Sequence, residues 1–161
     1  MISLRVAIAD DDRGMCESLQ RMLSNLGHDV VAVADNGQSL VNQCATTAPD
    51  VVITGTLTPE MYGADAAEAI YKSRPIPVIL YSGHCEPALV INAEHKHVFT
   101  YLVKPICQEH LETALKECLC TEPSEPTEGD WRMVPVGPAS ESFDSASHHE
   151  LSRPAYRRRP R

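Results

Sequence analysis

Three consecutive acids, Asp10, Asp11 and Asp12, follow a short apolar run near the N-terminus. Adjacent carboxylates repel one another unless a cation lies close by, and Mg²⁺ prefers carboxylate oxygens as ligands. Ser82 offers a hydroxyl to an oxyanion, and Lys104 supplies a fixed positive charge. Brought together, Asp10, Asp11, Ser82 and Lys104 would form a site for a phosphoryl group with Mg²⁺. For Asp12 we favour a structural role, as the cap of the helix that follows it.

The first 120 residues alternate between two hydrophobic patterns. Short runs rich in β-branched residues predict strands at residues 4–9, 30–34, 51–54, 78–82 and 101–103. Apolar residues at helical spacing predict helices near residues 15–26, 40–48, 66–71, 88–91 and 111–119. Five strands alternating with five helices predict an α/β fold, with a parallel sheet covered on both faces.

These elements determine where the reactive side chains are expected. In an open parallel sheet, ligands bind at the edge formed by the C-terminal ends of the strands. Asp10 and Asp11 follow the first predicted strand, Gly55 the third, Ser82 the fourth and Lys104 the fifth, so all five should lie at that edge.

Two glycines are expected to act through their backbone. Gly27 should stop the first helix. Gly63 should permit a positive φ in the turn after the third strand.

Composition limits the classes of protein that fit. The chain has 161 residues, 22 acids and 14 bases, for a formal net charge of −8, which makes a broad nucleic-acid surface unfavourable. The first residues do not predict a signal peptide, and no apolar run is long enough to cross a bilayer. The six cysteines include no CxxC pair, which favours free thiols over disulfides or a zinc site. We therefore expect a soluble, cytoplasmic protein that does not contact a membrane.

The composition changes after residue 120, which predicts two parts: a folded domain at 1–120 and a tail at 121–161. The tail holds six of the twelve prolines and lacks a periodic apolar pattern, which predicts disorder. The domain has 15 acids and 8 bases, or −7, and the tail has 7 acids and 6 bases, or −1. The tail nevertheless ends in the basic sequence RRRPR, which we interpret as a solvated end rather than a nucleic-acid contact.

Four motifs in order carry a resemblance to a known family. RVAIADDD, PDVVITGTLTPEMYG, PVILYSG and YLVKPI together resemble the receiver domains of two-component response regulators, the CheY-like superfamily. The resemblance implies a flavodoxin-like, doubly wound five-stranded parallel sheet of order 2-1-3-4-5 with five helices. It also implies that Ser82 and Tyr101 are switch residues, that Lys104 is the family's lysine, and that Pro105 follows a cis peptide bond.

One position departs from the family pattern. The family places its phospho-accepting aspartate four residues before the loop proline, here Pro59, and that position is Gly55. Glycine has no side chain to phosphorylate, and its presence removes one metal ligand. The resemblance therefore implies at most a weak Mg²⁺ site at Asp10 and Asp11, and no required cofactor. From the sequence alone, Gly55→Asp is expected to restore phosphate acceptance.

The resulting expectation is a stand-alone receiver-like protein of a two-component or phosphorelay pathway that works without phosphorylation and is not an enzyme. It would bind a sensor kinase or another regulator, and the family often dimerises through the face of the fourth helix, fifth strand and fifth helix. Two alternatives stay open. Asp11 or Asp12 could accept the phosphoryl group, or the scaffold could sense a small ligand or redox change beside Gly55, Ser82 and Cys85.

Overall fold

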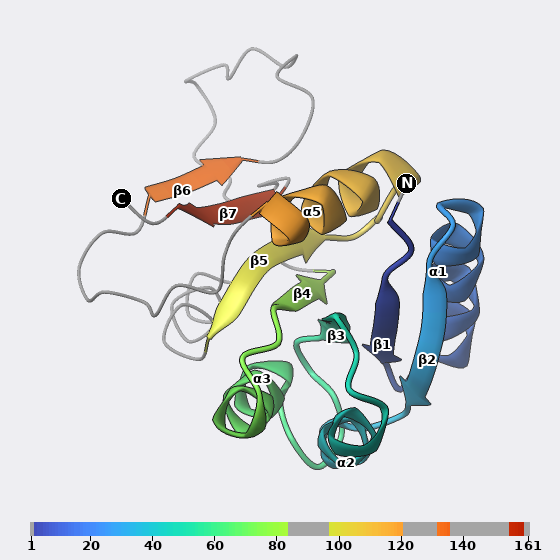
Figure 1. The fold of residues 1–161 in the computed structure, drawn as a ribbon, viewed down its shortest axis with the longest axis vertical. Coiled ribbons are helices and arrows are strands. Elements are labelled where there is room, and N and C mark those ends of the chain that lie inside the picture. The colour runs from blue at the N-terminus through green and yellow to red at the C-terminus, as the bar shows by residue number, and fades with distance from the viewer. Residues whose placement is uncertain (1, 84–96, 121–131, 136–154, 160–161) are drawn as a thin grey trace.

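Five parallel strands form the centre of the fold in the computed structural model, which describes residues 2–83, 97–120, 132–135 and 155–159 (Figure 1). The strands lie in the order β2-β1-β3-β4-β5. Their bounds are β1 Arg5–Ala9, β2 Asp29–Ala34, β3 Val51–Gly55, β4 Val78–Ser82 and β5 Val98–Val103. This order confirms the predicted doubly wound α/β fold.

Four helices are described, and they cover both faces of the sheet. Their bounds are α1 Arg13–Asn25, α2 Gly37–Thr47, α3 Gly63–Ser73 and α5 Gln108–Cys120. The helix predicted near residues 88–91 lies outside the described residues. Figure 1 shows α2 and α3 on one side of the sheet and α1 and α5 on the other. No helix in the described part of the chain is long and apolar enough to span a bilayer.

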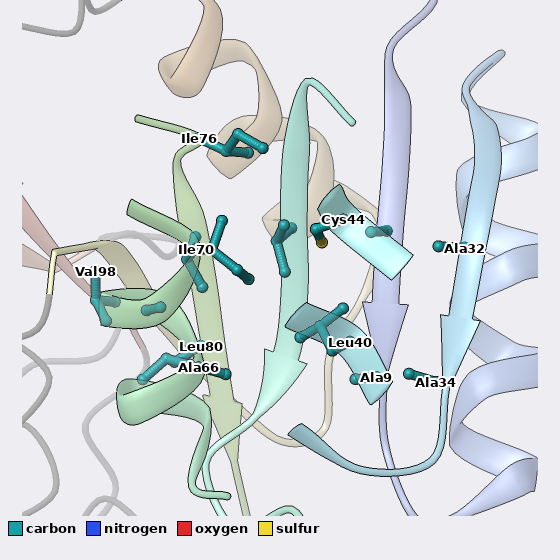
Figure 2. Close-up of a cluster of buried hydrophobic side chains, with 14 of the residues drawn as sticks. Ala9, Ala32, Ala34, Leu40, Cys44, Ala66, Ile70, Ile76, Leu80 and Val98 are labelled. Atoms are coloured by element: carbon teal, nitrogen blue, oxygen red, sulfur yellow. The ribbon is translucent and has the colours of Figure 1, made fainter. Parts of the chain in front are cut away.

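Burial explains why these segments fold as they do. Every residue of β3 and β4 is buried, as expected for central strands covered on both faces. Two apolar clusters result. One packs α2 and α3 on the sheet, with small side chains such as Ala9 and Ala34 opposite Leu40 (Figure 2). The other packs α1 and α5 on the opposite face, with Leu19 and Leu111 among its members.

Local sequence fixes the ends of the helices. The Asp12 carboxylate accepts hydrogen bonds from the backbone N–H groups of Gly14 and Met15, which confirms the predicted cap of α1. Gly27, with φ at 81°, follows the end of that helix and confirms the predicted stop. Asn36 caps α2 in the same way, since its side chain accepts from the backbone of Ser39 at 2.7 Å.

Gly63 has a different role from the expected one. Among the glycines of the described residues, the one with a positive φ is Gly27, so the prediction of a positive φ at Gly63 was wrong. A Cβ at position 63 would instead lie 2.2 Å from the carbonyl oxygen of Gly55. The backbone N–H of Gly63 also donates to the Thr56 carbonyl at 3.0 Å. Gly63 is therefore needed because α3 begins in direct contact with the end of β3.

Two further strands extend the sheet beyond β5. β7, Ala155–Arg159, pairs antiparallel with β5, and β6, Arg132–Pro135, pairs antiparallel with β7. Both strands lie in the segment 121–161, for which the sequence predicted disorder. The residues of β6 and β7 are instead paired in the sheet. An edge strand offers unpaired backbone groups to any segment that reaches it, and local composition does not reveal that contact. The boundary at residue 120 stays a prediction, and residues 121–131 and 136–154 lie outside the described residues.

Candidate functional site

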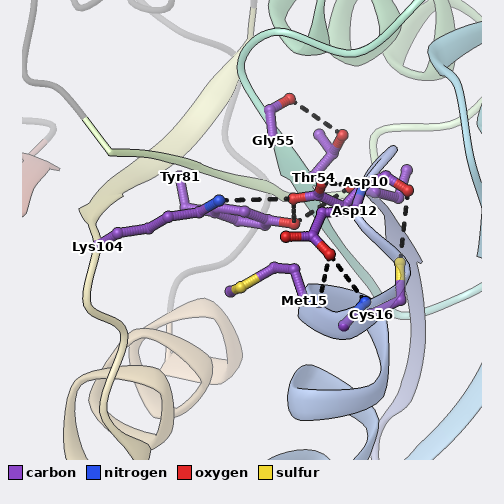
Figure 3. A network of polar contacts seen from close by, with 10 residues as sticks. Asp10, Asp12, Met15, Cys16, Thr54, Gly55, Tyr81 and Lys104 are labelled. Atoms are coloured by element: carbon purple, nitrogen blue, oxygen red, sulfur yellow. Dashed lines mark hydrogen bonds and ion pairs between the residues drawn. The ribbon is translucent and has the colours of Figure 1, made fainter.

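The strand ends at one edge of the sheet surround a buried carboxylate, that of Asp10. Asp10 directly follows β1, Gly55 ends β3, and Lys104 directly follows β5. The Lys104 amine, Nζ, lies 3.9 Å from Oδ2 of Asp10. A Cβ added at Gly55 would lie 3.4 Å from the same oxygen. The structure thus brings these three predicted residues together (Figure 3).

Both oxygens of the Asp10 carboxylate have partners. Asp10 is 6% exposed. Its Oδ1 accepts a hydrogen bond from the backbone N–H of Asp12 at 2.7 Å. Its Oδ2 accepts one from the hydroxyl of Tyr81 at 2.5 Å and faces the Lys104 amine. A buried carboxylate is costly unless it is paired in this way, so these contacts explain how the charge is held beneath the surface.

Tyr81 is the residue of this site that the sequence analysis missed. It lies in β4, is 1% exposed, and pairs in register with Gly55 of β3. Its ring carbon Cε2 would lie 3.8 Å from a Cβ at position 55, and the ring centroid lies 5.3 Å from the Lys104 amine. Only the register of the two strands in the structure reveals that a glycine lies beside one of the largest side chains.

The ionisation of Tyr81 is suppressed by its surroundings. Burial is the main cause that raises the pKa of Tyr81 far above its usual value of 10, and the hydrogen bond to Asp10 adds to it. The phenol therefore stays neutral over the physiological pH range, with its proton available for donation. Figure 3 shows its hydroxyl and the Lys104 amine both meeting the Asp10 carboxylate.

The carboxylates of the other two acids of the triplet make no contact with that of Asp10 in the described residues. Asp11 is exposed. Asp12 is also exposed, and its carboxylate is used by the first turn of α1, at 2.8 Å from the backbone nitrogen of Gly14. The triplet therefore divides by role, with a buried acid at the site, an exposed acid next to it and a helix cap.

The predicted switch residues lie in neighbouring strands, Ser82 in β4 and Tyr101 in β5. Ser82 is buried at the end of β4, and its carbonyl accepts a hydrogen bond from the Lys104 backbone N–H at 2.8 Å. Tyr101 is 3% exposed and packs in the cluster under α2 and α3, on the opposite face of the sheet from Tyr81. The peptide bond between Lys104 and Pro105 is cis, as the family resemblance led us to expect.

The residues present do not fit a complete Mg²⁺ site. Mg²⁺ requires near-octahedral oxygen ligation. Here both Asp10 oxygens are already hydrogen-bonded, and position 55 has no side chain. Among the described residues, no group of three His, Cys, Asp or Glu side chains is placed to hold a metal ion.

Two cysteines of the described residues, Cys16 and Cys44, are buried thiols. Cys16 is buried in α1, where its Sγ lies 3.5 Å from the backbone carbonyl oxygen of Asp10. Burial, followed by the charge of Asp10, raises the pKa of the Cys16 thiol. Burial raises the pKa of Cys44 to about 11. Cys85, named in the redox alternative, lies outside the described residues.

Comparison with known proteins agrees with this fold. Residues 6–116 match the family described as the response regulator receiver domain. The transcriptional regulatory protein PdtaR of Mycobacterium tuberculosis is 32% identical over 112 residues, or 70% of this chain and 55% of PdtaR. The chemotaxis protein CheY of Thermotoga maritima is 32% identical over 114 residues, or 70% of this chain and 95% of CheY.

A solved structure agrees with the sequence relatives. The signal receiver domain of the putative response regulator NarL from Mycobacterium tuberculosis has a TM-score of 0.72 and 30% identity, and the match covers 76% of this chain and 100% of that domain. The chain therefore belongs to the response regulator receiver family, the CheY-like signalling modules of two-component systems. It spans about half the length of PdtaR, 55%.

Proposed function

We propose that this chain is a receiver-type signalling protein that acts by binding other proteins and does not need phosphorylation. Gly55 stands at the family's phospho-acceptor position in this proposal. The observation that carries it is the glycine at the end of β3, directly beside Asp10 and in register with Tyr81. An acyl phosphate requires a carboxylate, and Gly55 has none.

The state of the metal site supports the same proposal. Phosphoryl transfer to a carboxylate needs positive charge near the developing negative charge. Lys104 supplies one cation, but it already faces Asp10. Asp10 and Asp11 together would hold Mg²⁺ at most weakly, and the proposed function requires no cofactor.

The proposed partners follow from membership of the family, whose receiver domains interact with kinases and other proteins. We propose a sensor kinase or another regulator as the partner of this chain, in a cytoplasmic pathway, with no enzymatic activity of its own. Nucleic acid is a poor partner for a protein with a net charge of −8. A homodimer through the face of the fourth helix, β5 and α5 also belongs to this proposal. Any dimer that uses the β5 edge must first displace β7.

Two alternatives make different predictions. Asp11 is exposed and lies next to Asp10, so it is the better placed of the two neighbouring acids to accept a phosphoryl group. Asp12 already caps α1. A small-ligand sensor would need space beside Gly55, where the Tyr81 ring lies.

The test is to incubate the full-length protein with Mg²⁺ and acetyl phosphate and then measure its intact mass. We expect no mass increase, whereas each phosphoryl group would add about 80 Da. A receiver that carries an aspartate at the acceptor position serves as the positive control. An acid-labile adduct on this chain would contradict the proposal, and peptide mapping of that adduct to Asp11 or Asp12 would establish the first alternative.

A further inference from the structure

The contacts of Tyr81 give the site a second departure from a phospho-accepting arrangement, separate from the missing aspartate. The phenol passes beside Gly55 and ends at Oδ2 of Asp10. The same oxygen faces the Lys104 amine, which also lies over the Tyr81 ring. Tyr81, Lys104 and the backbone of Asp12 thus give each oxygen of the Asp10 carboxylate a partner without a metal ion.

We propose that Tyr81 is a built-in plug of the acidic site, which occupies the space of the absent carboxylate and metal ion and excludes both. By plug we mean the phenol ring and hydroxyl of Tyr81 between Gly55 and Asp10. This inference rests on the proposed function, since it explains why the site is closed as well as incomplete. If only the acceptor aspartate were missing, a carboxylate at position 55 would restore the site. A site that Tyr81 also fills is not reopened by that carboxylate alone.

The local geometry carries the steric part of this inference. A Cβ at position 55 would fit, at 3.4 Å from Oδ2 of Asp10 and 3.8 Å from Cε2 of Tyr81. These are ordinary van der Waals contacts, so alanine would be tolerated. The carboxyl group of an aspartate extends beyond Cβ, where the Asp10 carboxylate and the Tyr81 ring already border the space. Glycine at 55 and tyrosine at 81 are therefore a pair matched in size.

Charge carries the second part of this inference. Aspartate at position 55 would place a second carboxylate against Asp10, and two close carboxylates disfavour their own ionisation unless a cation joins them. A divalent cation could join them only by taking Oδ2 of Asp10 from the Tyr81 hydroxyl. Substitution of Gly55 alone therefore adds the acceptor and leaves the metal position occupied. Both changes are required to open the site.

The experiment measures Mg²⁺ binding by isothermal titration calorimetry with magnesium chloride on full-length variants. The set comprises wild type, Gly55→Asp, Tyr81→Val and the double variant Gly55→Asp/Tyr81→Val. Gly55→Asp/Tyr62→Val is the matched control, because Tyr62 lies exposed in the loop before α3. Gly55→Asp/Tyr81→Leu is made in parallel, since leucine fills more of the vacated volume if valine prevents folding. Circular dichroism and thermal unfolding verify that each variant is folded.

We expect the folded double variant to bind Mg²⁺ at least roughly tenfold more tightly than Gly55→Asp alone, the size of effect that residues next to a metal's ligands produce. The Tyr62 control should match Gly55→Asp. Equal affinities of Gly55→Asp and the folded double variant would overturn the plug. That result would leave the proposed function intact, because the proposed function is judged separately, by the mass of the wild-type protein after phosphodonor treatment.

Discussion

At the scale of single residues, the Asp10 carboxylate is a charged group that is buried and therefore needs partners. It is buried at the end of β1, and its charge is stable there only because an amide, a phenol and an amine surround it. Replacing Tyr81 by phenylalanine removes the hydroxyl and keeps the ring. The contribution of this one hydrogen bond to stability can therefore be measured.

We expect Tyr81→Phe to lower the free energy of unfolding by about 1–3 kcal/mol, since it leaves one oxygen of a buried carboxylate without its donor. Urea denaturation measures this change. Tyr62→Phe removes the same hydroxyl from an exposed side chain and should change stability by less than about 0.5 kcal/mol. Equal effects of the two substitutions would contradict the assigned contact.

At the scale of elements, most of the fold was predictable because its strands and helices follow strong local patterns. Central strands such as β3 and β4 are continuous apolar runs, and the cap at Asp12 and the stop at Gly27 are local features. The contact between Tyr81 and Asp10 was not predictable in this way. It joins residues 71 positions apart, and it depends on which face of β4 the tyrosine occupies.

The role of Gly63 was also not predictable from the local sequence. Its sequence position suggested a turn with positive φ, but the structure uses it for a close approach of α3 to β3. Such an approach becomes visible only when both elements are placed in space. The strands β6 and β7 were missed for the same reason, since β7 depends on the free edge of β5 rather than on its own composition.

We expect Gly63→Ala to destabilise the protein by more than about 2 kcal/mol, because overpacking at a backbone contact forces α3 away from β3. The added Cβ would meet the Gly55 carbonyl oxygen at 2.2 Å. Gly83→Ala is the control, since a Cβ there meets no atom of the described residues within 4 Å. Thermal unfolding of the two variants checks the difference, and a Gly63→Ala protein as stable as Gly83→Ala would contradict the contact.

The connection between α1 and β2 makes stability depend on pH through His28. The Leu4 backbone N–H donates to Nδ1 of His28 at 3.2 Å. Burial lowers the pKa of His28 below its usual 6.5, against the weaker opposing effects of Glu112 and Asp29. The unfolded chain therefore takes up this proton first as the pH falls. The contribution that neutral His28 makes to the free energy of unfolding is thus lost as the pH falls below about 6.5.

His28→Asn should remove that part of the pH dependence, because asparagine offers an oxygen acceptor to Leu4 and does not titrate. Urea denaturation of wild type and variant at several pH values between 7.5 and 5.5, a range of roughly one unit on either side of the usual histidine pKa, measures the difference. We expect the gap between the two proteins to shift in favour of the variant as the pH falls. A gap that stays constant would contradict the lowered pKa of His28.

At the scale of the whole molecule, the C-terminal segment protects the open edge of the sheet. β7 pairs with β5 through Thr100–Arg157, Tyr101–Tyr156 and Leu102–Ala155. Edge strands are sites of pairing between chains unless they are covered. The position of β7 therefore links the tail to the proposed dimer face, which includes the same strand.

We expect removal of residues 121–161 to speed hydrogen exchange in β5 at Thr100–Leu102 at protein concentrations that keep the chain monomeric. Hydrogen–deuterium exchange with mass spectrometry compares full-length and truncated chains. The central strand β3 is the internal control, because its partners β1 and β4 are unaffected by the truncation. Unchanged exchange in β5 would contradict the pairing with β7.

The central claim is that the acidic site of this receiver is closed and does not respond to metal or phosphodonor. The most direct measurement is a ¹H–¹⁵N NMR spectrum of the wild-type protein, recorded before and after Mg²⁺ and then acetyl phosphate are added, with sodium chloride matching the ionic strength. We predict that the amide signals of Asp10, Gly55 and Lys104 keep their positions. Shifts centred on these residues and spreading to Ser82 would contradict the account.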